Sequence, residues 1–266
     1  MTTVHTLASG STGNALLLSC GESHILLDAG ISCRRVTAAL RELGLEPGSL
    51  SAILITHTHA DHISGLQTLL KRCGAPLFAT ERAGRELAWR LPDAEARLEV
   101  LDFGAPRSIG DVAVTAVPTS HDAPGSCGFR LDTADGAVGV LTDTGYVTDE
   151  AADALLGVDL AVLEANHDIE TLRSGPYPYY LKQRILGPQG HLSNVDAARF
   201  AAALAESGAS EIVLAHLSRE NNTPAMAQTA VEQALSAAGV SPLLSVAPRD
   251  CPGPAHVVCR RSVCKR

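Results

Sequence analysis

Four side chains of the kinds that bind divalent metal ions lie within six consecutive residues of this chain: His57, His59, Asp61 and His62. Imidazole nitrogens and carboxylate oxygens are the ligands that zinc and similar borderline metals accept. A run this short cannot direct all four groups at one ion. A tight turn can instead point His57 and His59 to one side, and Asp61 and His62 to the other. The spacing therefore predicts two ions side by side, about 3.5–4 Å apart, as in two-metal hydrolytic sites.

The segments on either side of this motif have the patterns of a strand and a helix. Residues 51–56 are mostly apolar and β-branched, and have the length of a buried strand. Residues 63–70 carry apolar side chains at helical spacing, with Ser64 or Asp61 as the expected N-cap. The four candidate ligands are thus expected at the turn where a buried strand leads into a helix.

A His-x-His-x-Asp-His motif between a strand and a helix resembles the signature of the metallo-β-lactamase superfamily. The resemblance implies three further ligands, each of which follows a predicted strand: His121, Asp143 and His216. It also implies two divalent ions per chain, Zn²⁺ or Mn²⁺. The implied ligand sets are His57, His59 and His121 for one ion, Asp61, His62 and His216 for the other, and Asp143 shared by both. The motif does not identify the substrate, because hydrolases of several kinds carry it.

The order of predicted elements indicates an α/β protein. Strands and helices follow each other in two rounds, with every candidate ligand at a strand end, which predicts the αββα sandwich of this superfamily: two mixed β-sheets face to face with helices outside. Asp28, at the end of the third strand, is expected to orient the metal ligands. We expect a single domain over residues 1–248. Residues 249–266, whose cysteines and His256 lack zinc-finger spacing, are expected to form a frayed surface tail.

The composition excludes several classes of protein. No run approaches the ~18 apolar residues of a membrane span, and the first residues lack the pattern of a signal peptide. The seven scattered cysteines suit reduced thiols better than a disulfide framework. We therefore expect a soluble cytoplasmic protein without a membrane partner. The net charge of −8 disfavours bulk electrostatic coating of nucleic acid, but leaves room for a local basic groove.

Four phrases outside the metal motif together resemble the bacterial YycJ/WalJ family, with similarity over about residues 3–246. They are LASGSTGN (7–14), EANHD (164–168), GHLSN (190–194) and LAHLSRENN (214–222). Members of that family are regarded as exonucleases that degrade DNA from the 5′ end and take part in mismatch repair. The resemblance therefore implies a metal-dependent phosphodiesterase whose partner is nucleic acid, with DNA favoured over RNA. It implies nothing about oligomeric state.

The segment 177–184 is consistent with a nucleic-acid substrate. It places three of the four tyrosines of the chain beside two cations, and interleaved aromatic and basic side chains hold single strands by stacking and phosphate pairing. An amphipathic helix with tyrosines in the core would give the same pattern. The candidate substrate-binding residues are Tyr179 with Lys182 and Arg184 from this segment, Asn14 from the glycine-rich turn 9–14, and Ser218 and Asn221 from the fourth phrase.

The expected mechanism is attack on phosphorus by a metal-bridging hydroxide, because coordination lowers the pKa of water from 15.7 to about 7. Asp61 and His191 are the candidate catalytic residues, and His191 is expected to stabilise the transition state or to protonate the leaving oxygen. A helix-capping structural role for His191 remains open. Three other functions also remain open: a transfer-RNA 3′-end endoribonuclease, a small-molecule (lactam or thioester) hydrolase, and a non-enzymatic binding module on the same fold.

Overall fold

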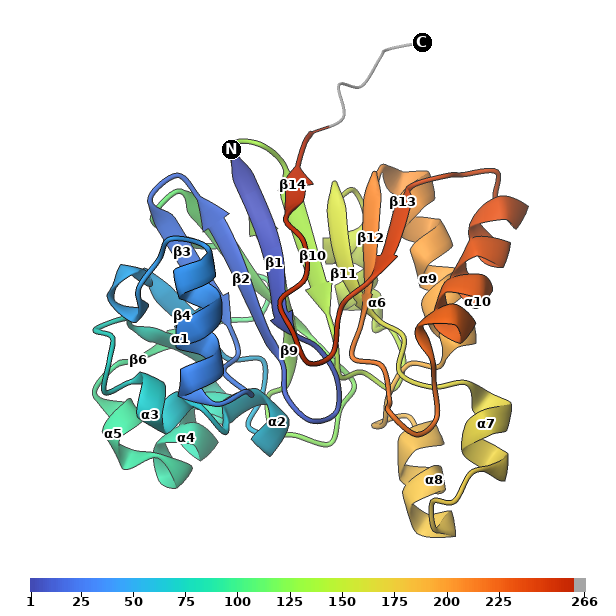
Figure 1. Ribbon diagram of the computed structural model, residues 1–266, viewed down its shortest axis with the longest axis horizontal. Helices are drawn as coiled ribbons and strands as arrows, with labels where there is room; N and C mark the ends of the chain where they lie inside the picture. Colours follow the sequence, from blue (N-terminus) through green and yellow to red (C-terminus); the bar gives the residue numbers. More distant parts are fainter. Residues whose placement is uncertain (261–266) are drawn as a thin grey trace.

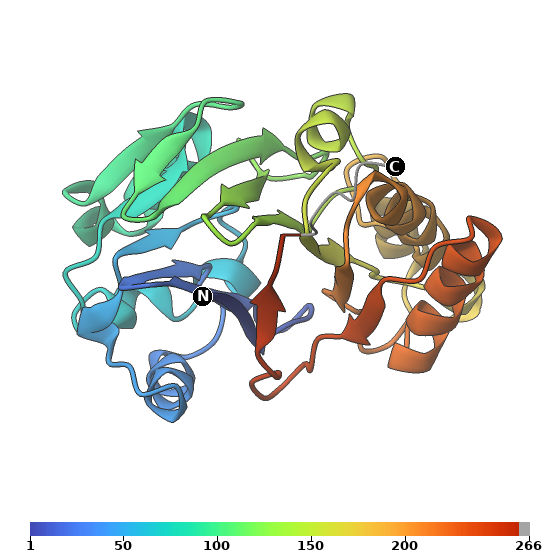
Figure 2. The same ribbon diagram turned by 90° about the horizontal axis from the view of Figure 1, so that it is seen from above.

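Two seven-stranded sheets pack face to face in the computed structural model, which describes residues 1–260 (Figures 1 and 2). The first sheet contains, in spatial order, β14 (His256–Val258), β1 (Thr2–Ala8), β2 (Ala15–Cys20), β3 (Ser23–Leu27), β4 (Ala52–Leu54), β5 (Leu77–Thr80) and β6 (Leu98–Leu101). The second contains β13 (Leu243–Val246), β12 (Glu211–Ala215), β11 (Leu160–Glu164), β10 (Ala137–Leu141), β9 (Cys127–Asp132), β8 (Val112–Pro118) and β7 (Arg107–Ile109).

The helices follow the same division of the chain. The first half contains α1 (Cys33–Glu42), the 3₁₀ turn η1 (Pro47–Ser49), α2 (Ala60–Ile63), α3 (Leu66–Leu69), α4 (Glu81–Arg90) and α5 (Pro92–Glu95). The second half contains α6 (Asp149–Leu155), α7 (Ile169–Ser174), α8 (Tyr179–Leu186), α9 (Asn194–Ser207) and α10 (Pro224–Ala237). None of the helices described between residues 1 and 260 is long and apolar enough to cross a membrane.

Buried apolar side chains form three layers, which explains why the sandwich is stable. The central layer lies between the sheets and joins Val4 and Ile25 of the first to Phe129 and Val162 of the second. A second layer packs α1, α3 and α4 on the first sheet, and a third packs α6, α9 and α10 on the second. Burial of apolar surface is the main favourable term in folding. The central layer therefore holds the two sheets together, and each outer layer holds its helices against its sheet. The predicted αββα fold is confirmed.

Parallel pairing brings several strand ends to one edge of the molecule. β3 pairs in parallel with β4 in the first sheet, and β10, β11 and β12 are parallel neighbours in the second. The carboxyl ends of parallel strands meet at the same edge of a sheet, so the loops after them are neighbours. In Figure 1 this edge is the lower one, where α2 and α8 lie. The chain segments that carry the candidate ligands leave the sheets here.

The helix after the metal motif differs from the prediction. Instead of one helix over residues 63–70, capped at Ser64 or Asp61, the chain forms α2 with His59 at its N-cap position, then α3 after Gly65. At the break, the backbone N–H of Gly65 donates to the carbonyl of Ala29 at 2.8 Å instead of to the preceding helical turn, and a Cβ on Gly65 would lie 1.9 Å from the carbonyl oxygen of Ile31. The loop that follows β3 therefore packs directly against the backbone at Gly65, a contact that a local pattern does not reveal.

The predicted frayed tail is wrong for residues 256–258. They form β14, which pairs antiparallel with β1 in the register Thr2↔Val258 and Val4↔His256. Both Val258 and His256 are buried, and Glu211 Oε1 accepts a hydrogen bond from His256 Nδ1 at 2.6 Å. The three-residue strand is too short to stand out in the sequence. We propose that the single domain extends past residue 248. Cys264, which the predicted tail includes, lies outside the described residues.

Candidate metal centre

The four loops that leave β4, β8, β10 and β12 bring all seven candidate ligands together. The loop after β4 carries His57 to His62, and the other three loops carry one ligand each. His59 and Asp61 are half-buried, whereas the other five are buried. The side-chain atoms fall into overlapping groups that could each hold one ion: His57, His59 and His121; Asp61, His62 and His216; and His57, His62 and Asp143.

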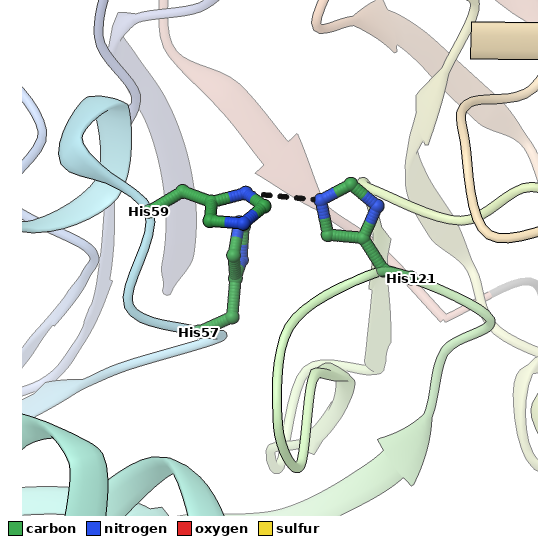
Figure 3. Close-up of side chains that lie close together, drawn as sticks. All are labelled: His57, His59 and His121. Atoms are coloured by element: carbon green, nitrogen blue, oxygen red, sulfur yellow. Dashed lines mark hydrogen bonds between the residues drawn. The ribbon is translucent and has the colours of Figure 1, made fainter. Parts of the chain in front are cut away.

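The three-histidine group has the spacing of a metal site. Figure 3 shows His59 and His121 pointing toward each other from separate loops, with Nε2 of His121 3.2 Å from Nδ1 of His59. Two nitrogens bound tetrahedrally to zinc at about 2.0–2.1 Å lie roughly 3.3 Å apart. Nε2 of His57 is buried and has no hydrogen-bond partner. A buried polar atom without a partner is costly, and an ion between the three rings would supply the partner.

Asp143 lies between this group and the second one. Its Oδ2 is 3.3 Å from Nε2 of His62 and 3.2 Å from Nδ1 of His216, and its Oδ1 is 3.8 Å from Nε2 of His121. Burial raises the pKa of the Asp143 carboxyl, but His216 and His62 outweigh it and hold that pKa well below its usual value. An ionised carboxylate therefore faces both groups, as the prediction of a shared ligand requires.

Hydrogen bonds from the far side fix the orientation of the histidine rings. Asp28 Oδ2 accepts from Nδ1 of His62 at 2.7 Å, and the Gly190 carbonyl accepts from Nδ1 of His121 at 3.0 Å. The backbone N–H and the hydroxyl of Thr56 both donate to Asp28 and hold its carboxylate in place. Each Nε2 then faces the centre, which is how protein metal sites commonly orient imidazole ligands. The expectation that Asp28 orients a ligand agrees with these contacts.

Backbone strain is concentrated at this centre. Within residues 1–260, the non-glycine residues with positive φ are Asp28 (60°), Asp143 (58°) and His216 (54°). The left-handed conformation costs about 1–2 kcal/mol for a residue with a Cβ. Each of the three directly follows a strand, or comes one residue later, and turns a polar side chain inward. Strain of this kind persists where the surrounding structure enforces it, typically at functional sites.

We expect Asp28→Asn to weaken metal binding by roughly 10- to 100-fold, because loss of an orienting carboxylate has effects of this size. Asparagine keeps the shape and tolerates positive φ, so the fold should survive. The measurement is competition with a calibrated metal chelator, with thermal unfolding as the control for folding. A metal affinity equal to that of the unchanged protein would show that Asp28 does not support the site.

Glu164 is a site residue to which the sequence pattern assigned no role. It ends β11 and is completely buried, and its Oε1 accepts a hydrogen bond from Nδ1 of His191 at 2.7 Å. Its Oε2 accepts from the backbone N–H groups of Thr144 and Leu192. Glu164 therefore orients His191 from the side of β11. A carboxylate that directly follows four apolar strand residues was the signal that could have identified it.

His191 lies beside the metal centre as a cation. Burial lowers its pKa, but the carboxylate of Glu164, with smaller contributions from Asp143 and Asp61, raises the pKa of His191 to about 9. Its Nδ1 is 3.7 Å from Oδ1 of Asp143. A protonated imidazole at this place can donate a proton or a hydrogen bond to a reacting oxygen. These contacts favour the catalytic role over helix capping, which Ser193 performs for α9.

A cavity of about 310 Å³ opens over the centre, and the candidate substrate residues lie at different distances from it. Arg184 and Ser218 line this cavity, together with Tyr177 and Ser11. Arg184 also forms an ion pair with Asp122, whose Oδ1 lies 3.7 Å from Nε2 of His59. One ion pair, between Arg184 and Asp122, therefore lies on the wall of the cavity. This wall can face a phosphodiester that enters the centre.

The other four candidate substrate residues do not line this cavity. Tyr179 and Lys182 line a second cavity on the other side of His191. Asn14 lies against the ligands, with Nδ2 3.1 Å from Nε2 of His62, and bonds to the Gly10 backbone.

Asn221 is completely buried, and its Nδ2 donates to Ser218 Oγ, whereas its Oδ1 has no hydrogen-bond partner among the described residues. Its contact with the substrate stays a prediction.

The fold and the site together define a metal-dependent hydrolase of the metallo-β-lactamase class. The β-lactamase superfamily domain matches residues 23–217, so the chain belongs to this superfamily. Within it, the chain belongs to the WalJ/YycJ family. It is 38% identical to exodeoxyribonuclease WalJ of Streptococcus pneumoniae over 87% of both chains, and 36% identical to exodeoxyribonuclease YycJ of Bacillus anthracis over 88% of this chain and 89% of that one.

Solved structures agree on the fold. The metallo-β-lactamase fold protein YhfI from Bacillus subtilis superposes with a TM-score of 0.72, over 96% of this chain and all of that one, at 17% sequence identity. An identity this low supports the fold and says nothing about the substrate.

Proposed function

We propose that this protein is a metal-dependent exonuclease that degrades DNA from the 5′ end. The observation that carries the proposal is the similarity to two exodeoxyribonucleases over most of the chain, at 36–38% identity. The site geometry supports it, since five of the seven candidate ligands, a protonated histidine and an arginine line one cavity. We further propose that the protein acts in the cytoplasm, in DNA repair.

The donor set fits two divalent ions, either Zn²⁺ or Mn²⁺. His57, His59 and His121 would hold one, Asp61, His62 and His216 the other, and Asp143 would contact both. Bound there, divalent ions polarise a phosphodiester and lower the pKa of a coordinated water. The mixture of imidazole and carboxylate suits either metal.

The protein residues would bind and orient the substrate and move a proton. Arg184 places a positive charge on the cavity wall, where it can pair with a phosphate of the strand. The protonated His191, held by Glu164, can donate a proton from its free Nε2 to the leaving oxygen. Asp61 is half-buried at the cavity and would keep its contacts with His62 and His216 during the reaction.

The test is a nuclease assay with end-labelled substrates. In Mn²⁺ or Zn²⁺ we expect the protein to shorten single- or double-stranded DNA stepwise from the 5′ end, with much less activity on matched RNA. Because catalysis needs the ions, excess chelator should stop the reaction and added metal should restore it. Product lengths on a denaturing gel give the polarity.

Three other results of such assays would each contradict the proposal and support one of the alternative functions. Cleavage of a transfer-RNA precursor near its 3′ end, with DNA left intact, would indicate the endoribonuclease function. Hydrolysis of a lactam or thioester with no nuclease activity would indicate a small-molecule hydrolase. Binding of nucleic acid without hydrolysis of any substrate, in metal-loaded protein, would indicate a binding module.

A further inference from the structure

A second cavity, of about 470 Å³, lies beside the metal-lined one and shares His191 with it. Its walls come from α7, α8 and the start of α9, including Arg173, Tyr179 and Ser193. Its size is within the range of about 300–1,000 Å³ that is usual for small-ligand pockets. A part of the substrate that enters this second cavity therefore lies next to the part that reacts at His191. None of the seven candidate ligands lines this cavity.

His167 is the most informative residue of this cavity. It lines the wall, only 1% of its surface is exposed, and neither ring nitrogen has a hydrogen-bond partner. Burial lowers the pKa of His167 to about 4, against the opposing effect of Glu164. At neutral pH the ring is therefore uncharged, with one donor and one acceptor. Buried polar groups in native proteins are nearly always paired, so this ring is arranged for a ligand or for water.

The other polar groups of the cavity suit a nucleotide. Tyr179 is 76% exposed and presents its ring for stacking, and Gln183 adds an amide that can both donate and accept. Arg173 and Lys182 supply two positive charges. Nζ of Lys182 donates to the carbonyl of Arg173 and keeps two further protons for a phosphate.

Two carboxylates near the cavity are already paired. Asp196, which lines the wall, accepts from Ser193 Oγ and pairs with Arg199, and Glu170 pairs with Arg173. Their charge is thus partly compensated within the protein, and the pair with Glu170 equally compensates part of the charge of Arg173.

We propose that this second cavity binds the unstacked base of a nucleotide next to the scissile phosphate, and the inference rests on the proposed nuclease function. Tyr179 stacks on the base, and His167 and Gln183 bond to its edge, while Lys182 and Arg173 bind the neighbouring phosphate. A neutral donor–acceptor pair recognises the edge of a base, and an aromatic ring stacks on any base. With the base held there, the DNA strand passes His191, and the scissile phosphate enters the metal centre.

The test compares oligonucleotides that carry an abasic residue on one or the other side of the first scissile phosphate. With the unaltered protein, removal of the base from one of these positions should lower kcat/KM by roughly tenfold, the size of a lost stacking contact. The same substitution should have little effect on His167→Leu or Tyr179→Ala, because these variants have already lost the interaction. Arg85→Ala, on the exposed face of α4, is the matched control and should show the full abasic effect.

The stability of His167→Leu separates a ligand role from a structural one. Since the imidazole is buried without partners, leucine should leave the melting temperature unchanged or raise it. Equal rates on intact and abasic DNA with the unaltered protein would overturn the proposal. A full abasic effect that persists in both variants would also overturn it. A protein that degrades no DNA at all would instead refute the proposed function. The cavity could then be tested by itself, in a metal-free binding titration with a fluorescent base analogue. We expect the unaltered protein to bind the analogue and His167→Leu to lose this binding.

Discussion

Asp143→Asn is expected to abolish activity, with kcat/KM reduced by at least about 1,000-fold. The Asp143 carboxylate lies within 4 Å of His62, His121 and His216, so its charge is shared by both halves of the centre. Metal ions contribute several kcal/mol to transition-state stabilisation, and each 1.36 kcal/mol is a factor of ten. Asparagine keeps the size of the side chain and tolerates its φ of 58°. The fold should therefore remain while the ions are lost.

Metal content measured by elemental analysis, together with activity and thermal unfolding, checks this expectation. We expect close to two divalent ions per chain in the reconstituted protein and fewer than one in Asp143→Asn. Asp250→Asn is the matched control, since Asp250 is exposed, lies outside the centre and pairs with Arg219. Two ions and full activity in Asp143→Asn would exclude a shared carboxylate. Little metal in the reconstituted unaltered protein would exclude a dinuclear centre altogether.

The residues that the structure gathers at this centre could be selected from the sequence because each has a local signal, which the resemblance to the superfamily made specific. His121, Asp143 and His216 follow apolar strands directly or within three residues, and the sheet brings such positions together whatever the loops between them do. The signal of the hexapeptide from His57 to His62 is equally local, since a single turn separates the pair His57 and His59 from the pair Asp61 and His62. The fold could be predicted for the same reason, because alternation and helical spacing describe the elements one at a time.

What could not be predicted depends on contacts between distant segments. Glu164 is 27 residues before His191, and only the packing of β11 against the loop after α8 joins them. Asn221 has a polar side chain in a phrase that resembles the family, yet the loop after β12 buries it completely. The basic and aromatic residues of α8 fall on two cavities, because Arg184 and Lys182 lie on different sides of the helix. Helical spacing puts these two residues on different sides, but it does not reveal that a cavity lies on each side.

His191→Ala is expected to lower kcat by about 10²- to 10⁴-fold, the usual contribution of a general acid, with KM little changed. Glu164→Gln should lower kcat by less, because glutamine can keep the contact with Nδ1 but lacks the charge that raises the pKa of His191 to about 9. Thermal unfolding serves as the check that both variants fold, since Glu164 is buried and also accepts from two backbone N–H groups.

Metal content distinguishes this role from an alternative that the geometry also allows. Asp143, Glu164, His191 and His216 together form a group that could hold an ion, so a loss of rate alone would fit a ligand as well as an acid. If His191 is the acid, His191→Ala retains the metal content of the unaltered protein and loses turnover. The variant should then regain most of its rate on a substrate whose leaving group needs no proton, such as a p-nitrophenyl phosphodiester. If His191→Ala instead loses one ion and is equally impaired on both substrates, His191 is a ligand, and the proton for the leaving oxygen must come from another group at the cavity.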